Sequence, residues 1–157
     1  MFRSLNIKLV LIFIVFIISV MSVVGVFLLD RVSAFYADDF IQQMNTGFTD
    51  QLKNTLIACF SQENPAEAQK DVITAYSGRF SFDSYRNFYI LDMNGNILES
   101  SADKSGAVAK TSNLVAAMNR ETGENSASGS DFFDYASYIT DGENECIIYI
   151  YMTILPV

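Results

Sequence analysis

The chain opens with an apolar run that no charged residue interrupts. This run extends from Leu9 to Leu29 and consists largely of Leu, Ile, Val and Phe. Its length matches the ~20 residues that a helix needs to cross the hydrocarbon core of a bilayer. A helix is also the one single-segment structure that satisfies its own backbone hydrogen bonds in lipid. The run therefore predicts a transmembrane helix over residues 9–29.

A cleaved signal peptide is the competing interpretation of this run. Its apolar region would span roughly 7–15 residues and end at a cleavage site made of small residues. Here the run is longer, and Leu28-Leu29-Asp30-Arg31 follows in place of small residues. The sequence favours an uncleaved anchor in the cell membrane.

The charges around the span predict its orientation. Arg3 and Lys8 lie before it, in a stub of residues 1–8, and an excess of Lys and Arg marks the cytoplasmic side. Residues 30–157 should then be extracytoplasmic. They hold all eighteen acidic residues and eight of the ten basic ones, which leaves a net charge of −10. This charge argues against nucleic acid as a partner and against docking on anionic lipid through a basic surface. Membrane lipid is the expected partner of residues 9–29, which would span the bilayer.

The chain contains no histidine, which excludes Ser-His-Asp and Cys-His triads and any phosphoaccepting histidine from this segment. Its two cysteines, Cys59 and Cys146, are too few for a disulfide framework. A bond between them would close a long loop, worth about 4–5 kcal/mol in the chain-entropy model. Free cysteine is also a common small buried residue, so both alternatives stay open.

Helical periodicity continues beyond the span. Apolar residues recur at every fourth position: Val32, Tyr36, Phe40, Met44, Phe48, Leu52, Leu56 and Phe60. Residues four apart share a helix face, but a strict four-residue repeat drifts around the helix. We expect one long helix to about Phe60, its upper half packed on a domain and its lower half paired with a second copy. Gly47 is a local weakness in it.

A second helix is expected after Ser61-Gln62-Glu63-Asn64-Pro65. Asn64 suits the N-cap, Pro65 suits the first helical position, and Gly78 suits the stop. A short helix capped by Ser112 or Asn113 is expected farther along the chain.

Four strands are predicted from the region beyond Phe80. Apolar runs at Phe88–Asp92 and Ile97–Ser101 flank Asn94-Gly95, and this dipeptide is a strong hairpin signal because both residues tolerate positive φ. Two further strands are expected at Phe132–Ile139 and Cys146–Leu155, after a polar loop at Glu121–Ser130. On the last strand, Tyr149 and Tyr151 should share a face with Ile147, opposite Ile148, Ile150 and Met152. Helices followed by an antiparallel sheet indicate an α+β domain.

The layout and one motif resemble a known family. A stub ending in Asn6-Ile7-Lys8-Leu9-Val10, one span and a long helix open many bacterial membrane sensor histidine kinases. The segment from Phe88 to Ser101 resembles the first hairpin of their extracytoplasmic PAS-like, or single-Cache, domains. The nearest type is the kinases that regulate cell-wall metabolism in Gram-positive bacteria. The resemblance covers the whole chain in layout, but in sequence only the anchor and the hairpin.

The resemblance implies a two-component sensor that works as a homodimer, binds an unidentified extracellular signal and passes it to a cognate response regulator. The parent kinase would use ATP and magnesium, whereas no cofactor, metal or catalytic residue is expected in this chain. The alternative is a membrane-anchored ligand-binding or chemoreceptor-type module with a different output or none. An anchored enzyme is a third hypothesis, which the absence of catalytic motifs disfavours.

The family's domain carries a fifth strand, a second membrane helix, a HAMP linker and a kinase core. None of these is found in the sequence. The apolar Cys146–Leu155 strand should need a partner on each edge, because an exposed apolar edge invites aggregation. Since Tyr135–Ile139 covers one edge, we expect the last strand of the sheet to be missing and the parent gene to continue beyond Val157.

Candidate ligand-binding residues are Arg79, Arg86, Tyr89, Tyr135 and Tyr138. The two arginines precede the first strand, where the resemblance implies carboxylate-recognising groups, although the sequence favours exposed solubilising charges. Tyr135 and Tyr138 belong to an aromatic set that would line a pocket or fill the core; its other members are Tyr85, Phe88, Phe132 and Phe133. Asp92 and Asn94 suit a turn. An acidic group lacks the spacing of a calcium loop, so no metal site is predicted; its members are Asp131, Asp134, Asp141, Glu143 and Glu145.

The predicted orientation can be tested with single cysteines introduced into the Glu121–Ser130 loop. In intact cells they should react with a membrane-impermeant thiol reagent, because residues 30–157 are expected outside. Cysteines introduced into the residues 1–8 stub are the matched control and should react only after lysis. The opposite labelling pattern would reverse the assigned orientation.

Overall fold

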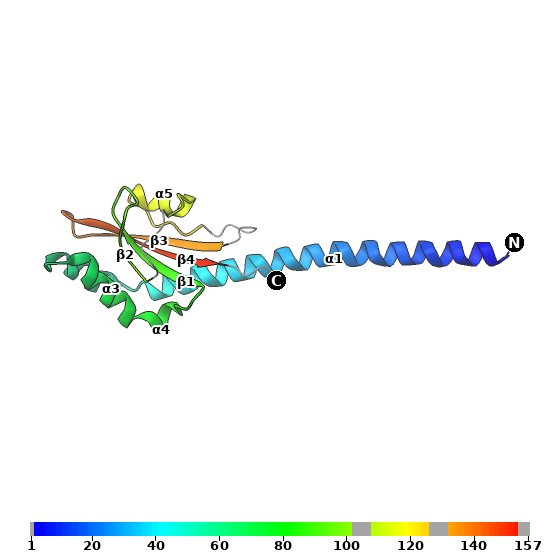
Figure 1. Cartoon of the computed structure of the whole chain (residues 1–157), viewed down its shortest axis with the longest axis horizontal. Helices are drawn as coiled ribbons and strands as arrows, with labels where there is room; N and C mark the ends of the chain where they lie inside the picture. Colours follow the sequence, from blue (N-terminus) through cyan, green and yellow to red (C-terminus); the bar gives the residue numbers. More distant parts are fainter. Residues whose placement is uncertain (1, 102–107, 126–131, 154–157) are drawn as a thin grey trace.

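The computed structural model of this chain describes residues 2–101, 108–125 and 132–153. A single helix, α1 (Phe2–Gly47), contains the apolar run and continues into a folded domain. Figure 1 shows α1 as a long rod that leaves the domain at one end. The helix is long and apolar enough to span a membrane, and no residue in its most apolar window is buried. The α+β class predicted from the sequence is confirmed.

The long helix does not reach Phe60 unbroken, contrary to the expectation from its periodicity. It ends at Gly47, and α2 (Asp50–Ala58) begins after Thr49, whose hydroxyl accepts a hydrogen bond from the Leu52 N–H (3.3 Å). A single 3-10 turn, η1 (Cys59–Ser61), follows. The break explains how the drifting repeat still serves one core, because it redirects the chain before Leu52 and Leu56. Both of these side chains are fully buried.

Gly78 does not end the second helix as predicted. Helix α3 (Pro65–Ala75) ends before it, and Gly78 lies inside the short helix α4 (Ser77–Phe80). Ser81, in the left-handed conformation (φ 50°), ends α4 instead. Pro65 opens α3 as expected, but the Asn64 side chain makes no capping hydrogen bond.

The sheet has four antiparallel strands in the order β2-β1-β4-β3. They are β1 (Arg86–Leu91), β2 (Ile97–Ser100), β3 (Phe132–Thr140) and β4 (Glu145–Thr153). The hairpin between β1 and β2 is confirmed, with Gly95 at φ 86°. The Asp92 carboxylate accepts from the Asn94 and Asn96 N–H groups (2.8 Å each), which confirms its role in the turn.

The strand order corrects the expectation about β4. Its second edge does not await a missing strand, because β1 pairs with it from Arg86↔Met152 to Leu91↔Ile147. Chain order alone does not show that the first strand returns to the middle of the sheet. Residues 154–157, including the predicted end of this strand at Leu155, lie outside the described residues.

Helices cover both faces of the sheet. The end of α1, together with α2, α3 and α4, packs on one face, and α5 (Ser112–Met118) packs on the other (Figure 1). Along β4 the side chains alternate as predicted: Ile148 and Ile150 join the α1-side core, and Ile147 and Tyr149 join the α5-side core. The cap of α5 is Thr111, however, and neither Ser112 nor Asn113 takes that role.

Cys59 and Cys146 are free and buried. The Cys146 thiol donates to the Gln69 side-chain oxygen (3.5 Å), and the Cys59 thiol donates to the Thr55 carbonyl (3.3 Å). Burial raises the pKa of both thiols, that of Cys146 to about 12. The sequence left open a disulfide or two buried free cysteines, and the structure contains the free cysteines.

Gly47 should be intolerant of a side chain. A Cβ atom there would lie 2.5 Å from Phe80, which is fully buried and packs on Phe48 and Phe82. We expect Gly47→Ala to lower the free energy of unfolding by about 1–3 kcal/mol, as overpacking does. Gly78→Ala is the control, since a Cβ there meets nothing within 4 Å. Thermal unfolding of both variants by circular dichroism measures the difference, and equal stabilities would contradict the close contact.

Candidate functional site

A buried polar cluster lies on the α5 side of the sheet. Asp134 of β3 is 8% exposed and accepts a hydrogen bond from the amide of Asn113 (3.0 Å) and one from the hydroxyl of Thr111. Thr111 also caps α5 by accepting from the Leu114 N–H (3.1 Å). Both carboxylate oxygens of Asp134 therefore hold the start of α5 on the sheet. The cluster is charged and shielded from water, so its hydrogen bonds are strong.

Aromatic side chains surround this cluster on the same face. The rings of Tyr89 and Tyr149 lie 6.3 Å apart, and those of Phe132 and Tyr151 lie 5.1 Å apart. Tyr149 is buried, whereas the other three are partly exposed. Burial raises the pKa of Tyr149, and the negative charge of Asp134 adds to this effect. Aromatic rings beside a carboxylate suit the binding of a small apolar or cationic group rather than covalent chemistry.

A short segment after α5 ties this cluster to the sheet edge. Gly123 pairs with Ala136 of β3 through two backbone hydrogen bonds (2.9 and 3.0 Å). Asn113 then bonds the backbone of Asn125 twice, through Oδ1 (2.8 Å) and through Nδ2 (3.1 Å). Position 123 must be glycine, because a Cβ atom there would lie 2.1 Å from the Asn113 carbonyl oxygen. We call residues 123–125 the edge strap.

The edge strap reaches the helix on the opposite side of the sheet. Glu124 accepts a hydrogen bond from the Asn45 amide of α1 (2.8 Å), and Asn45 in turn accepts from the Tyr135 hydroxyl (3.0 Å). Burial raises the pKa of Tyr135, with a further contribution from the charge of Glu124. A chain of hydrogen bonds thus runs from the α5 face, around β3, to the last turns of α1.

Arg86 makes a second polar connection to α1. Its guanidinium donates to the Gln43 side-chain oxygen (2.6 Å) and to the Phe80 carbonyl, and it lies over the Phe40 ring (5.2 Å to the centroid). Burial lowers the pKa of Arg86, and the nearby charges of Asp83 and Asp39 act in the opposite direction. Arg86 therefore joins α1, α4 and β1 at one point.

The five predicted ligand-binding residues do not form one pocket. Arg79, Arg86 and Tyr135 lie on the α1 side, where Arg79 stacks on Tyr76 (4.9 Å) and Tyr135 packs on Phe48 (5.4 Å). The other two lie on the α5 side: Tyr89, beside Tyr149, and Tyr138, near the end of β3. Tyr138 and Arg120 both bond Glu145 and, with Arg120 the larger cause, hold the pKa of that carboxyl at about 2. A ligand role for these residues stays a prediction.

The acidic residues considered for a cation are also dispersed. Asp134 is buried at one end of β3, Asp141 and Glu143 occupy the far turn, and Glu145 pairs with Arg120. Asp131 lies outside the described residues. Within the described ranges, no group of three metal-ligating side chains gathers.

Sequence reasoning missed the residues that connect the two faces: Gln43, Asn45, Asn113, Gly123 and Glu124. Their hydrogen bonds join positions far apart in the chain, and polar residues in a helix or loop give no periodic signal of such contacts. Only the apolar surroundings of Asn113, next to Leu114 and Val115, hinted at burial.

No protein-family model, curated protein or solved structure matches this chain.

Asn113 should be essential to the cluster. We expect Asn113→Ala to lower the free energy of unfolding by about 1–3 kcal/mol, because it removes a donor from two buried oxygens of Asp134 and an acceptor from the partly buried Asn125 N–H. Ser112→Ala, at the exposed neighbouring position, is the matched control and should change little. Urea unfolding of the two variants measures the effect, and similar midpoints would show that the cluster does not hold α5.

Proposed function

We propose that this chain is the extracytoplasmic sensing and signal-transducing portion of a two-component sensor histidine kinase. One observation carries the proposal: α1 runs without a break from the apolar span into the core of the domain. A domain that only needed an anchor could hang from a flexible linker. A continuous helix, by contrast, carries a displacement along its axis, since its backbone hydrogen bonds resist bending.

The contacts at the end of α1 suit this role. Phe40 and Met44 are buried against the sheet, and Gln43 and Asn45 bond Arg86 and Glu124. Arg86 begins β1, while Glu124 belongs to the edge strap that holds α5. A change on either face of the sheet would therefore alter the packing of α1. Signal transfer further requires two packings of similar free energy, for which the break after Gly47 is our candidate element.

The fold is compatible with the resemblance to PAS-like, single-Cache domains. The predicted hairpin is present within an antiparallel sheet of four strands, with helices on both faces. We place the signal on the α5 face, where the partly exposed rings of Tyr89 and Tyr151 adjoin the Asp134 cluster.

The protein would lie in the cell membrane as a homodimer with its amino terminus in the cytoplasm, and an unidentified extracellular signal would reach the domain. A kinase part encoded downstream would use ATP and magnesium and pass phosphate to a response regulator. The alternative is a membrane-anchored ligand-binding or chemoreceptor-type module.

The parent gene provides the deciding test. We expect the reading frame to continue past codon 157 into a second membrane helix, a HAMP linker and a histidine-containing dimerisation domain. Sequencing of the locus measures this directly. A methyl-accepting coiled coil or a cyclase domain in that place would retain the sensor and change its output. A stop codon would remove the kinase proposal and leave the anchored binding module.

A further inference from the structure

Three exposed aromatic side chains lie at the end of the folded domain that faces the span. Outside residues 9–29, the large apolar side chains described as exposed are Ile7, Val32, Phe35, Tyr36, Tyr85, Leu98 and Val115. The three aromatic ones are Phe35 (67% exposed), Tyr36 (58%) and Tyr85 (46%). The first two lie on α1 between the span and the domain. Their rings meet edge to face, 5.9 Å apart.

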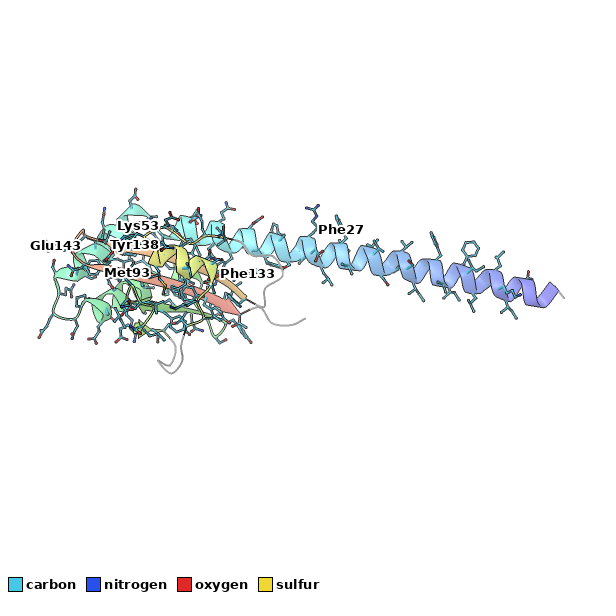
Figure 2. The ribbon with its side chains drawn as sticks, turned by 90° about the horizontal axis from the view of Figure 1, so that it is seen from above. Phe27, Lys53, Met93, Phe133, Tyr138 and Glu143 are labelled. Carbon is cyan, nitrogen blue, oxygen red and sulfur yellow. The ribbon has the colours of Figure 1, made fainter. Side chains whose placement is uncertain are left out.

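Tyr85 lies at the same end, although it comes from a different segment. It precedes β1, and both of its backbone groups are held: its N–H donates to Asp83 (2.7 Å), and its carbonyl accepts from the Thr153 N–H (2.9 Å). The start of β1 and the end of β4 face the side where α1 leaves the domain (Figure 1). Figure 2 shows the same arrangement, with Phe133 near the point where α1 leaves the domain and Glu143 at the opposite end.

The continuous helix sets the height of these rings above the span. At 1.5 Å per residue, Phe35 lies about 9 Å beyond Leu29, and Ala37 lies about 12 Å beyond it. Ala37 is the first buried residue of α1 on the domain side. Side chains on a helix tilt toward its amino terminus, which here means toward the membrane. Since the headgroup layer extends about 5–8 Å beyond the hydrocarbon, the rings of Phe35 and Tyr36 fall within or next to it.

We propose that the base of the domain rests on the bilayer, with Phe35, Tyr36 and Tyr85 forming an aromatic collar in the headgroup layer. Tyrosine rings favour this layer, which accepts both an apolar body and a hydrogen-bonding tip, and the Phe35 ring packs edge to face on the Tyr36 ring. Asp38, Asp39 and Asp83 are exposed at the same end and would repel anionic lipid. The partner is therefore a zwitterionic headgroup layer. Of the roles proposed above, the collar requires only that residues 9–29 span the membrane, and it is independent of the signalling role.

A second copy of the chain is the competing partner for part of this surface. Val32, Phe35 and Tyr36 share one helix stripe, which a partner helix could cover. Tyr85 is not part of that stripe, and a planar layer accounts for exposed aromatic rings from two separate segments more directly than a single helix does.

The chain contains no tryptophan, so single tryptophans report on the collar without background. The full chain is reconstituted in phosphatidylcholine vesicles that contain lipid brominated near the headgroup end of the acyl chains. The reporters are Tyr36→Trp and Tyr85→Trp. Phe27→Trp, inside the span, is the positive control for insertion, and Glu143→Trp, in the exposed far turn, is the negative control (Figure 2).

We expect bromolipid to quench both reporters well above the Glu143→Trp level, and added phosphatidylglycerol to weaken the quenching at position 85. Quenching of Phe27→Trp shows independently that the chain is inserted. If it is quenched while either reporter matches Glu143→Trp, the collar is refuted. Efficient disulfide cross-linking of Phe35→Cys between copies, together with an unquenched Tyr36→Trp, would assign the stripe to a second copy instead and overturn the proposal.

Discussion

The last turns of α1 must satisfy two structural requirements at once, and the rest of the structure depends on both. The helix must continue the span, and it must also bury one side against the sheet. Ala37, Phe40 and Met44 supply that buried side. Burial of a large apolar side chain contributes roughly 1.5–3 kcal/mol, so these contacts hold the domain to the helix more firmly than any surface ion pair could. Arg86 fixes the orientation of α1 relative to β1. Its hydrogen bonds to Gln43 and Phe80 and its stacking on Phe40 require one alignment of the two elements.

The sheet separates α1 from α5, and the edge strap joins them. Apolar packing across the sheet is non-directional, so by itself it singles out no particular pair of residues as the connection between the two layers. Hydrogen bonds are directional, so a shift of Asn113 moves Asn125, and a shift of Glu124 moves Asn45. The polar network therefore gives the two faces a specific connection. The Tyr135 hydroxyl completes it by binding Asn45 from within the core.

Much of the local structure was predictable from the sequence. The Asn94-Gly95 turn formed where the dipeptide indicated, and the alternation along β4 sorted Ile148 and Tyr149 to opposite faces. The end of the long helix was not predictable from its repeat, because Thr49 competes as a cap for α2 and Phe80 occupies the space beside Gly47. The candidate site was predicted least well. Arg86 and Tyr135 carry polar contacts to α1, a partner that no local pattern identifies.

What the sequence determined by itself are the features that depend on neighbours in the chain: the uncharged apolar run, the hairpin turn and the two-residue period of the strands. Their causes are backbone hydrogen bonding in lipid, the φ preference of glycine, and the alternation of side chains on a strand. The tertiary structure alone decided that β1 pairs with β4, that Gly123 pairs with Ala136, and that Glu124 reaches Asn45. These contacts join residues distant in sequence, and they form because the folded core brings the segments together, which no local preference encodes.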